Sequence, residues 1–244
     1  MRIKFAFLLA VLLLSGCATI GSPQFNVAIN SLSSPSAATE KTYILLPGNK
    51  DVTWNDLQFQ EYAGYLMRVL AAHGFVPAKT AAQADVAIVL FYGIGDPETH
   101  QYSYSLPVWG QTGIASSNTY GTVSSYGGSA SYSGTTTYTP SYGVTGYTSE
   151  TGSYTTYFRY ALITAFDFLK YRQSKKQVEL WKTTITSIGS SGDLRQVFPI
   201  LIAAAAPYIA SNTGKQIHVS LHEADPIVKA VKGEADGKSD GTDP

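Results

Sequence analysis

The sequence predicts an α+β fold, a two-layer sandwich in which two helices lie on one face of a mainly antiparallel sheet. Two segments have the spacing of amphipathic helices, while the other apolar segments alternate with period two or are short and β-branched. The predicted order is β-α-β, a long insertion, then β-β-α-β. Two helices can cover only one face of such a sheet. With 244 residues, 44% of them apolar, the chain can bury a sizeable core.

The part of the chain before the insertion predicts a strand, a helix and a second strand. Residues 41–47 ("KTYILLP") favour a strand, and Thr53 and Asp56 together resemble a helix start. Gly74 is placed to end that helix, and residues 84–95 ("ADVAIVLFYGIG") predict a strand central in the sheet. Helical spacing defines one apolar face of the helix, formed by Phe59, Tyr62, Leu66, Val69, Leu70 and His73.

Beyond the insertion, two strands and a later third strand are expected. Residues 154–168 and 178–188 are rich in β-branched and aromatic residues and are joined by a polar, basic connector, a pattern typical of a long hairpin. Residues 215–223 alternate apolar and polar side chains as the final strand.

A second amphipathic helix is predicted within residues 191–214. Pro199 and Pro207 interrupt this segment, so we expect either a kink or a helix that begins at Pro199, with Asn212 and Gly214 closing it. Its apolar positions follow helical spacing: Leu194, Val197, Phe198, Leu201, Ile202, Ala205, Tyr208 and Ile209.

Residues 1–16 form a separate element with the pattern of a signal peptide. Arg2 and Lys4 precede an apolar stretch, residues 5–14, which is too short to span a bilayer comfortably as a helix. The tetrapeptide "LSGC" that ends at Cys17 resembles the lipobox of bacterial lipoproteins, in which the cysteine is lipidated and becomes the first mature residue. The alternative is an ordinary signal peptide with an unrelated cysteine.

The lipobox resemblance implies an anchor and a location. Several acyl chains such as palmitate on Cys17 would hold the protein essentially permanently in a membrane, whereas one chain binds only marginally. Ala18, where aspartate would favour retention in the inner membrane, implies the outer membrane of the cell envelope. Cys17 is also the only cysteine, so no intramolecular disulfide can form.

Composition places the domain boundaries and excludes one class of partner. Residues 17–40 are predicted to be the lipidated N-terminus and a tether, although residues 24–29 ("QFNVAI") alternate well enough for a short strand. Residues 41–232 form a single domain with an insertion at about 100–153, and residues 233–244 a disordered tail. The 17 basic and 17 acidic residues balance, so the chain lacks the basic footprint of nucleic-acid binding.

Several segments together resemble a family of uncharacterised bacterial envelope lipoproteins, a domain-of-unknown-function family. They are the lipobox, "KTYILLP" before a helix, "HGFVPA" followed by "ADVAIVLFYG", and "VELWKTTITSIGSSGDLRQVFPILIAAAAPYIASNTG". The resemblance covers residues 41–95 and 157–221 and implies an α+β envelope domain. It supplies no catalytic residues, and the insertion is longer and richer in tyrosine than the family pattern.

The histidines offer few candidates for chemistry. His218 and His222, followed by Glu223, suggest a metal site, but on a strand residues four apart are about 13 Å apart. Exposed histidines are the simpler interpretation. His73 is expected to cap a helix C-terminus, where the helix dipole favours a positive imidazole. His100 follows an acidic turn, and an exposed turn accounts for that cluster.

No motif predicts catalysis. The "GIG" of residues 93–95 lacks the third glycine and the following helix of a dinucleotide-binding motif, and no G-x-S-x-G occurs. We therefore expect no catalytic residues, no metal site and no cofactor, and a protein that is not an enzyme.

The insertion contains the most unusual pattern, tyrosines at a constant six-residue interval among glycine, serine and threonine. Three interpretations compete: a flexible loop, a hexapeptide β-helix and a β arm. Most of its tyrosines are even-numbered, so one uninterrupted strand would place them on one face, although glycines would preserve this only piecewise. Glu150 is the only fully charged residue between Thr99 and Tyr157. The expected interaction surface comprises Tyr120, Tyr126, Tyr132, Tyr138, Tyr142 and Tyr147.

These patterns predict a lipid-anchored, non-enzymatic envelope lipoprotein with a β-rich interaction surface. Its expected partners are the membrane, through the N-terminal lipid, and a copy of itself, another envelope protein or a glycan. The alternative is an auxiliary subunit of an envelope transport or secretion machine, in which the domain docks the partner. A hydrolase or metal enzyme is the third hypothesis.

Overall fold

The computed structural model describes residues 23–38 and 41–234, in two compact units. The first, here called the sheet domain, comprises the described residues up to Glu98 and from Thr156 onward. The second, the hairpin unit, is Thr99–Thr155. The predicted signal peptide, the lipobox cysteine Cys17 and the end of the predicted tail lie outside the described residues.

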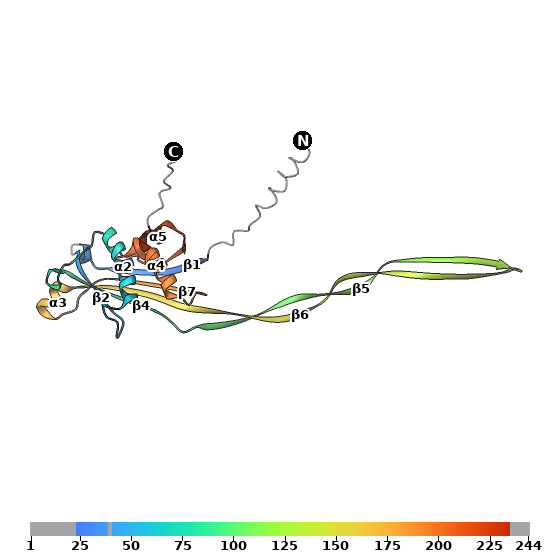
Figure 1. The fold of residues 1–244 in the computed structure, drawn as a ribbon, viewed down its shortest axis with the longest axis horizontal. Coiled ribbons are helices and arrows are strands. Elements are labelled where there is room, and N and C mark those ends of the chain that lie inside the picture. The colour runs from blue at the N-terminus through green and yellow to red at the C-terminus, as the bar shows by residue number, and fades with distance from the viewer. Residues whose placement is uncertain (1–22, 39–40, 235–244) are drawn as a thin grey trace, which may run out of the picture. The chain divides into compact units, whose positions relative to one another are not determined.

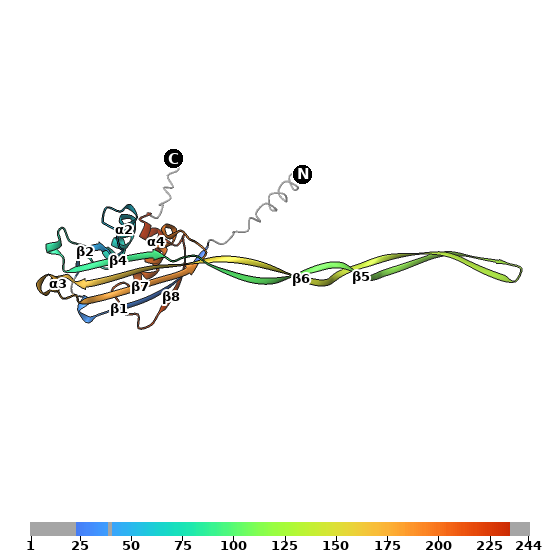
Figure 2. The same cartoon turned by 90° about the horizontal axis from the view of Figure 1, so that it is seen from below.

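The sheet domain is an α+β fold built on an open, mixed sheet (Figures 1 and 2). The strand order is β3-β2-β4-β6-β7-β1-β8. Strand β2 pairs in parallel with β3 and with β4, and the other neighbours on this path are antiparallel. The strands are β1 (Gln24–Ser33), β2 (Thr42–Pro47), β3 (Val76–Pro77), β4 (Val86–Ile94), β6 (Ser129–Asp167), β7 (Glu179–Gly189) and β8 (Ile217–His222).

Helices α2 (Leu57–Ala72), α4 (Leu194–Ala205) and α5 (Pro226–Lys232) lie over one face of this sheet (Figure 1). Alternate residues of the central strands point toward these helices and are buried, as in the antiparallel pair Ile163 and Thr183 of β6 and β7. In the core, a cluster of aromatic rings joins helices α2 and α4 to the sheet. The Tyr62 ring of α2 stacks on Phe198 of α4 at 3.9 Å and meets Tyr92 of β4 edge-on at 4.8 Å.

A further helix, α3 (Phe168–Ser174), belongs to the connector between β6 and β7, which the sequence predicted only as a polar hairpin connection. Asp167 caps it by accepting the Lys170 N–H at 2.7 Å, and Lys175 ends it in the left-handed conformation with φ 57°. Its Phe168 and Tyr171 line a small cavity with Leu46 on the sheet face opposite α2 and α4.

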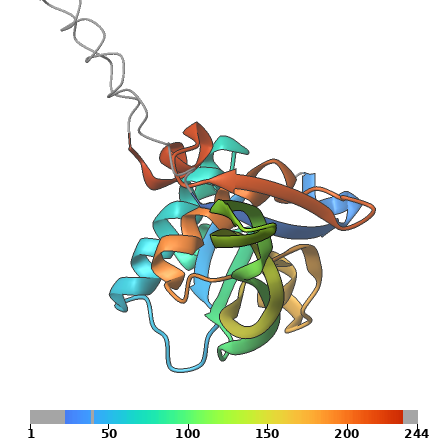
Figure 3. The ribbon, with the colours of Figure 1, turned by 90° about the vertical axis from the view of Figure 1, so that its right-hand side faces the viewer.

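The predicted tether, residues 17–40, is wrong for Gln24–Ser33. These residues form β1, coloured blue in Figure 3, which pairs with β7 and β8. Phe25, Val27 and Ile29 of this strand are buried. The short alternation of "QFNVAI" was the correct signal, because a strand with one buried face shows period two. The sheet domain therefore begins before residue 41.

Both predicted helices form, with different ends. Asp56, not Thr53, caps α2 by accepting the Phe59 N–H at 2.8 Å, and Gly74 follows the helix with φ 81° as expected. Helix α4 begins at Leu194 and runs through Pro199 rather than starting there. Burial of nearly every side chain in α4 outweighs the one backbone hydrogen bond that proline removes.

Helix α4 ends before the predicted closing residues. The α-helical part stops at Ala205, a 3₁₀ turn containing Pro207 follows (Ala206–Tyr208), and Asn212 and Gly214 lie in the loop before β8. Proline at the start of that turn cannot donate the hydrogen bond that would extend the α-helix. Helix α5 was not predicted as an element, and it buries Val228 and Val231 against the domain.

The hairpin unit consists of most of β5 (Glu98–Tyr126) and the first part of β6. Cross-strand contacts such as Thr119 with Thr136, and Thr112 with Ser141, show that the two strands run antiparallel. They are joined by a two-residue turn at Gly127 and Gly128, whose φ values of 59° and 84° suit a type I′ turn. Glycine is required there because other residues rarely adopt positive φ.

Candidate functional site

The tyrosines of the hairpin unit lie on both faces of the ribbon, not on one. A two-residue turn makes an even-numbered residue of β5 oppose an odd-numbered residue of β6, so even-numbered tyrosines on the two strands point in opposite directions. The hydroxyls of Thr119 and Thr136, 2.8 Å apart, show this pairing directly. The ring of Tyr132 lies over Gly121, next in sequence to Tyr120 and on the other face from it.

Each face near the turn therefore carries its own aromatic group. Tyr120 and Tyr126 share one face with Ile114, and Tyr132, Tyr138 and Tyr142 share the other with Val123. All of these side chains are exposed, and Tyr126 reaches 94%. A single tyrosine face was expected only for one uninterrupted strand. The turn at Gly127 and Gly128 interrupts it, so the even-numbered tyrosines of the two strands lie on opposite faces near the turn.

The pairing changes by one residue toward the base of the hairpin unit. There Thr99 contacts Thr155 at 3.2 Å, and the Tyr102 ring lies over Gly152, so even-numbered residues now oppose even-numbered ones. This shift brings aromatic rings together on one face: the His100 ring stacks on Tyr154 at 5.0 Å, and Tyr102 lies 6.1 Å from Tyr154. Tyr147, the remaining predicted surface residue, is exposed between these two regions.

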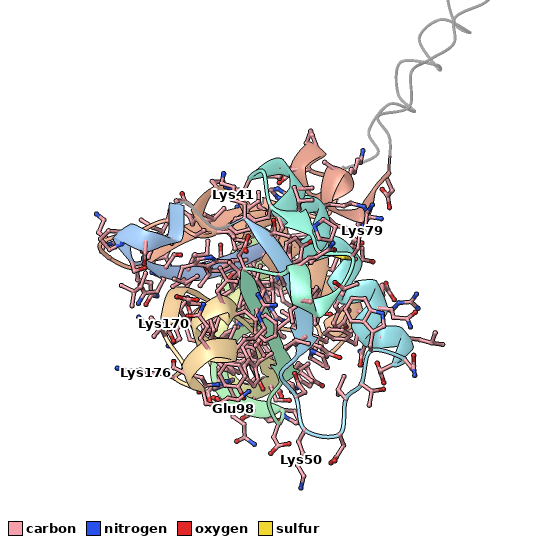
Figure 4. All side chains as sticks on the ribbon, turned by 90° about the vertical axis from the view of Figure 1, so that its left-hand side faces the viewer. Lys41, Lys50, Lys79, Glu98, Lys170 and Lys176 are labelled. Carbon is pink, nitrogen blue, oxygen red and sulfur yellow. The ribbon has the colours of Figure 1, made fainter. Side chains whose placement is uncertain are left out.

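Charged side chains are concentrated in the sheet domain. Lys50, Lys170 and Lys176 point outward from it (Figure 4). The hairpin unit contains only Glu150 as a fully charged residue. It therefore lacks the lysines and charged pairs with which sheet edges usually prevent pairing with other strands.

The predicted histidine sites do not converge on a metal centre. His218 is exposed on β8 and lies 3.3 Å from the Gln216 amide, while Glu223 accepts hydrogen bonds from Lys232 and Gln196. The Lys232 ammonium, more than the Gln196 amide, lowers the Glu223 pKa against the opposing effect of burial. Within residues 23–38 and 41–234, no group of three or more His, Cys, Asp or Glu side chains is arranged to hold a metal ion.

The other two histidines have structural contacts. His73 is the C-cap residue of α2, as predicted, and its ring Nε2 donates to the Ala206 carbonyl oxygen at 2.7 Å. Asp96 and Glu98 are exposed in the sheet domain, whereas His100 belongs to the hairpin unit.

Buried tyrosines of the core are held in the neutral form. Burial raises the pKa of Tyr62 to about 12, although a hydrogen bond from Gln58 opposes the shift. Burial and the hydrogen bond to Glu61 raise the pKa of Tyr65 to about 12 as well. These hydroxyls therefore stay protonated near neutral pH and act as packing and hydrogen-bonding groups.

The sequence analysis missed one polar group, the guanidinium of Arg159 on β6. Arg159 is 1% exposed, and it donates from Nη1 to the Ser191 carbonyl and from Nη2 to Ser187 Oγ, both at 2.9 Å. Its Nε has no hydrogen-bond partner among the described residues. Burial lowers its pKa, and among the described residues no carboxylate forms an ion pair with it. The sequence contained a signal for this burial. Arg159 precedes Ala161 and Ile163 at two-residue intervals, so on a strand all three side chains lie on the same, buried face.

Arg159 borders a small cavity of about 180 Å³ in the sheet domain. The cavity lies where the start of β1 meets the end of β7 and the start of α4. Its lining combines neutral polar and apolar side chains: Pro23, Gln24, Phe25, Asn26, Arg159, Ile188, Gly189, Ser190, Ser191 and Gln196.

Comparisons with known proteins add little to this geometry. No protein-family profile matches the chain, and no curated protein is similar to it in sequence. A PDZ domain protein from Parabacteroides distasonis has a similar arrangement at a TM-score of 0.35 and 9% identity, over 82% of this chain and 40% of that protein. That likeness is too low to carry an argument. Among the residues that the structure describes, no helix is long and apolar enough to cross a membrane.

Proposed function

We propose that this chain is a lipid-anchored, non-enzymatic lipoprotein of the bacterial envelope whose hairpin unit is a binding surface. The lipobox at Cys17 supports the anchor and the export, and because Cys17 is the only cysteine, the exported protein would have no intramolecular disulfide. The sheet domain serves as the carrier, a two-layer sandwich of the kind that the envelope lipoprotein family implies. The outer membrane is the proposed location.

The observation that carries the binding role is the exposure of the hairpin unit. A two-stranded ribbon in water is marginally stable at best. This ribbon presents aromatic side chains on both faces, and within the described residues its strands pair only with each other. Its backbone edges and tyrosine rings are therefore available to a partner, and covering them would stabilise the ribbon.

The chemistry of the ribbon limits the kinds of partner that it can bind. An uncharged edge permits pairing with a strand of another polypeptide, and tyrosine rings bury area at low entropic cost while keeping hydroxyls for hydrogen bonds. The proposed partner is a second copy of the chain, another envelope protein or a glycan.

Replacing Thr99–Thr155 with Asn-Gly tests the proposal. Thr99 and Thr155 are cross-strand neighbours, so a tight turn can join Glu98 to Thr156 and leave the sheet domain intact. The expected result is a folded, anchored protein that no longer retains the partners that the wild-type protein pulls down from membranes. Retention of the same partners would contradict the binding role of the hairpin unit.

Two matched variants locate the contact surface. Tyr120→Thr with Tyr126→Thr removes two rings from one face, and Tyr132→Thr with Tyr138→Thr removes two of the three rings from the other, leaving Tyr142. Loss of binding in one variant alone would assign the partner to that face. Loss of membrane attachment in Cys17→Ser is the separate test of the anchor, and normal acylation in that variant would contradict it.

A second candidate, an auxiliary subunit of an envelope machine, has one supporting observation. The sheet face opposite α2 and α4 carries apolar side chains on the β2, β4 and β6 strands, including Leu46, Val89, Phe91 and Leu162. Such a face can dock a partner protein. Partners retained after removal of Thr99–Thr155, and lost in Leu46→Ser with Phe91→Ser, would favour this second function.

A further inference from the structure

The buried guanidinium of Arg159 is the strongest sign of a ligand in the sheet domain. Buried arginines are normally paired with a carboxylate, because removing a charge from water is costly unless an opposite charge replaces the lost hydration. Arg159 is 1% exposed and forms no ion pair with any described residue. A guanidinium has five N–H donors, and two of those of Arg159 donate to acceptors in residues 23–38 and 41–234.

The surroundings of Arg159 hold it in place for an additional acceptor. Its Nη2 donates to Ser187 Oγ, which itself donates to the Asn26 carbonyl at 2.7 Å, while Nη1 donates to the Ser191 carbonyl. These contacts link β6, β7, β1 and the loop before α4, and they restrict the movement of the guanidinium. Within the part of the chain that the structure describes, its Nε has no acceptor.

Gly189 of β7 leaves room for the guanidinium of Arg159 on the neighbouring strand β6. A Cβ at this position would lie 2.9 Å from Nη2 and 3.3 Å from Nη1 of Arg159. The φ of Gly189 is not positive, so the backbone does not require glycine here. A glycine within a strand, where no turn or positive φ demands it, is typical of a place where another group approaches closely.

We propose that this cavity is a binding site for a small carboxylate, whose oxygens accept the free N–H groups of Arg159. Planar guanidinium and carboxylate groups match in geometry and form two parallel hydrogen bonds. A single negative charge balances the single positive charge, since Arg159 is the one charged side chain among the described residues that line the cavity. Gln24, Asn26, Ser190 and Gln196 offer neutral hydrogen-bonding groups, and Phe25 and Ile188 can contact a short apolar stem.

This site is independent of the binding role of the hairpin unit, because every lining residue belongs to the sheet domain. The volume of about 180 Å³ suits a small organic acid, not a large ligand. Inorganic phosphate is the competing anion, since arginine binds it by the same geometry but with a larger charge to balance.

Thermal unfolding and calorimetry of the purified full chain test the site, with sodium acetate and sodium phosphate compared against sodium chloride at equal ionic strength. A ligand that binds only the folded state raises the unfolding temperature. The expected result is a rise with acetate that exceeds the effect of chloride and of phosphate. An acetate effect equal to that of chloride would overturn the proposal, and tighter binding of phosphate would overturn the assignment to a carboxylate.

Two variants separate the site from the stability of the fold. Gly189→Ala places a methyl group against the guanidinium, and we expect acetate affinity to fall about tenfold or more. Gly95→Ala is the matched control, because its Cβ would meet neighbouring atoms only at 3.6 Å or more, and it should bind acetate as the wild type does. Arg159→Met should abolish the acetate effect. If Arg159→Met does not fold, Gly189→Ala alone tests the proposal. Unchanged acetate affinity in Gly189→Ala would overturn the proposed carboxylate site.

Discussion

Arg159 and Ser187 oppose each other on β6 and β7, and a hydrogen bond of 2.9 Å from Nη2 to Oγ joins them in the interior. The Ser187 hydroxyl in turn donates a hydrogen bond to the Asn26 carbonyl oxygen of β1. One hydroxyl thus both accepts from a buried cation and donates to the neighbouring strand. Three strands of the sheet are connected through a group that an apolar side chain of the same size cannot replace.

Ser187→Ala should destabilise the sheet domain by about 1–3 kcal/mol, because it leaves a buried guanidinium N–H and a carbonyl without their partner. Urea unfolding followed by circular dichroism measures this change. Thr184→Val on the same strand is the control: its hydroxyl is exposed, so its effect should stay within about 0.5 kcal/mol. Equal effects of the two variants would contradict the role of Ser187.

Phe198→Ala should cost about 3–5 kcal/mol of unfolding free energy, since Phe198 is fully buried and stacks on Tyr62 between α4 and α2. Urea midpoints measure the loss. Phe158→Ala removes a ring that is 45% exposed and should cost about 1 kcal/mol or less. A larger loss at Phe158 than at Phe198 would mean that the helices are not packed on the sheet as described.

Glu223 should make stability depend on acid pH. Its folded-state pKa lies below the ordinary value of 4.5, mainly because Lys232 donates to it at 2.9 Å. Its contribution is therefore complete above the unfolded-state pKa and is lost as the pH falls through the lowered folded-state value. With a side chain 41% exposed, the ion pair should contribute less than about 1 kcal/mol.

Urea midpoints of the wild type and Glu223→Gln between about pH 7 and about pH 2 check this dependence. The difference between the two proteins should be largest near neutral pH and should disappear at the acid end. Glu234→Gln, at an exposed position without an ion pair among the described residues, should follow the wild type throughout. A difference that grows toward acid pH would contradict the assigned sign.

Paired cysteines test the register of the hairpin unit. Thr119→Cys with Thr136→Cys, in a Cys17→Ser chain, should form a disulfide on oxidation, because the two hydroxyls are 2.8 Å apart on one face. Thr119→Cys with Thr137→Cys is the control, since neighbouring residues of a strand point to opposite faces. Peptide mapping without reductant measures both, and equal bridging in the two pairs would mean that the ribbon has no fixed register.

Local periodicity determined much of the fold. The α+β class, the helices over Phe59–Leu70 and Leu194–Ala205, and the strands β2, β4, β7 and β8 were predicted, because burial on one face imposes period 3.6 or period two on the residues themselves. The exposed aromatic residues of the hairpin unit, which carry the proposed function, were also visible in the sequence. The lipobox is a sequence motif and stays a prediction.

Only the tertiary structure decided the features that depend on which strands become neighbours. Strand β1 became part of the sheet because β7 and β8 pair with both of its edges, which its short alternation alone does not reveal. The tyrosines were divided between two faces because the turn at Gly127 and Gly128 sets even positions against odd ones. Arg159 became a candidate site because the packing of β1, β7 and α4 buries its charge without supplying an anion among the described residues. This burial depends on residues far apart in the sequence, which local periodicity cannot reveal.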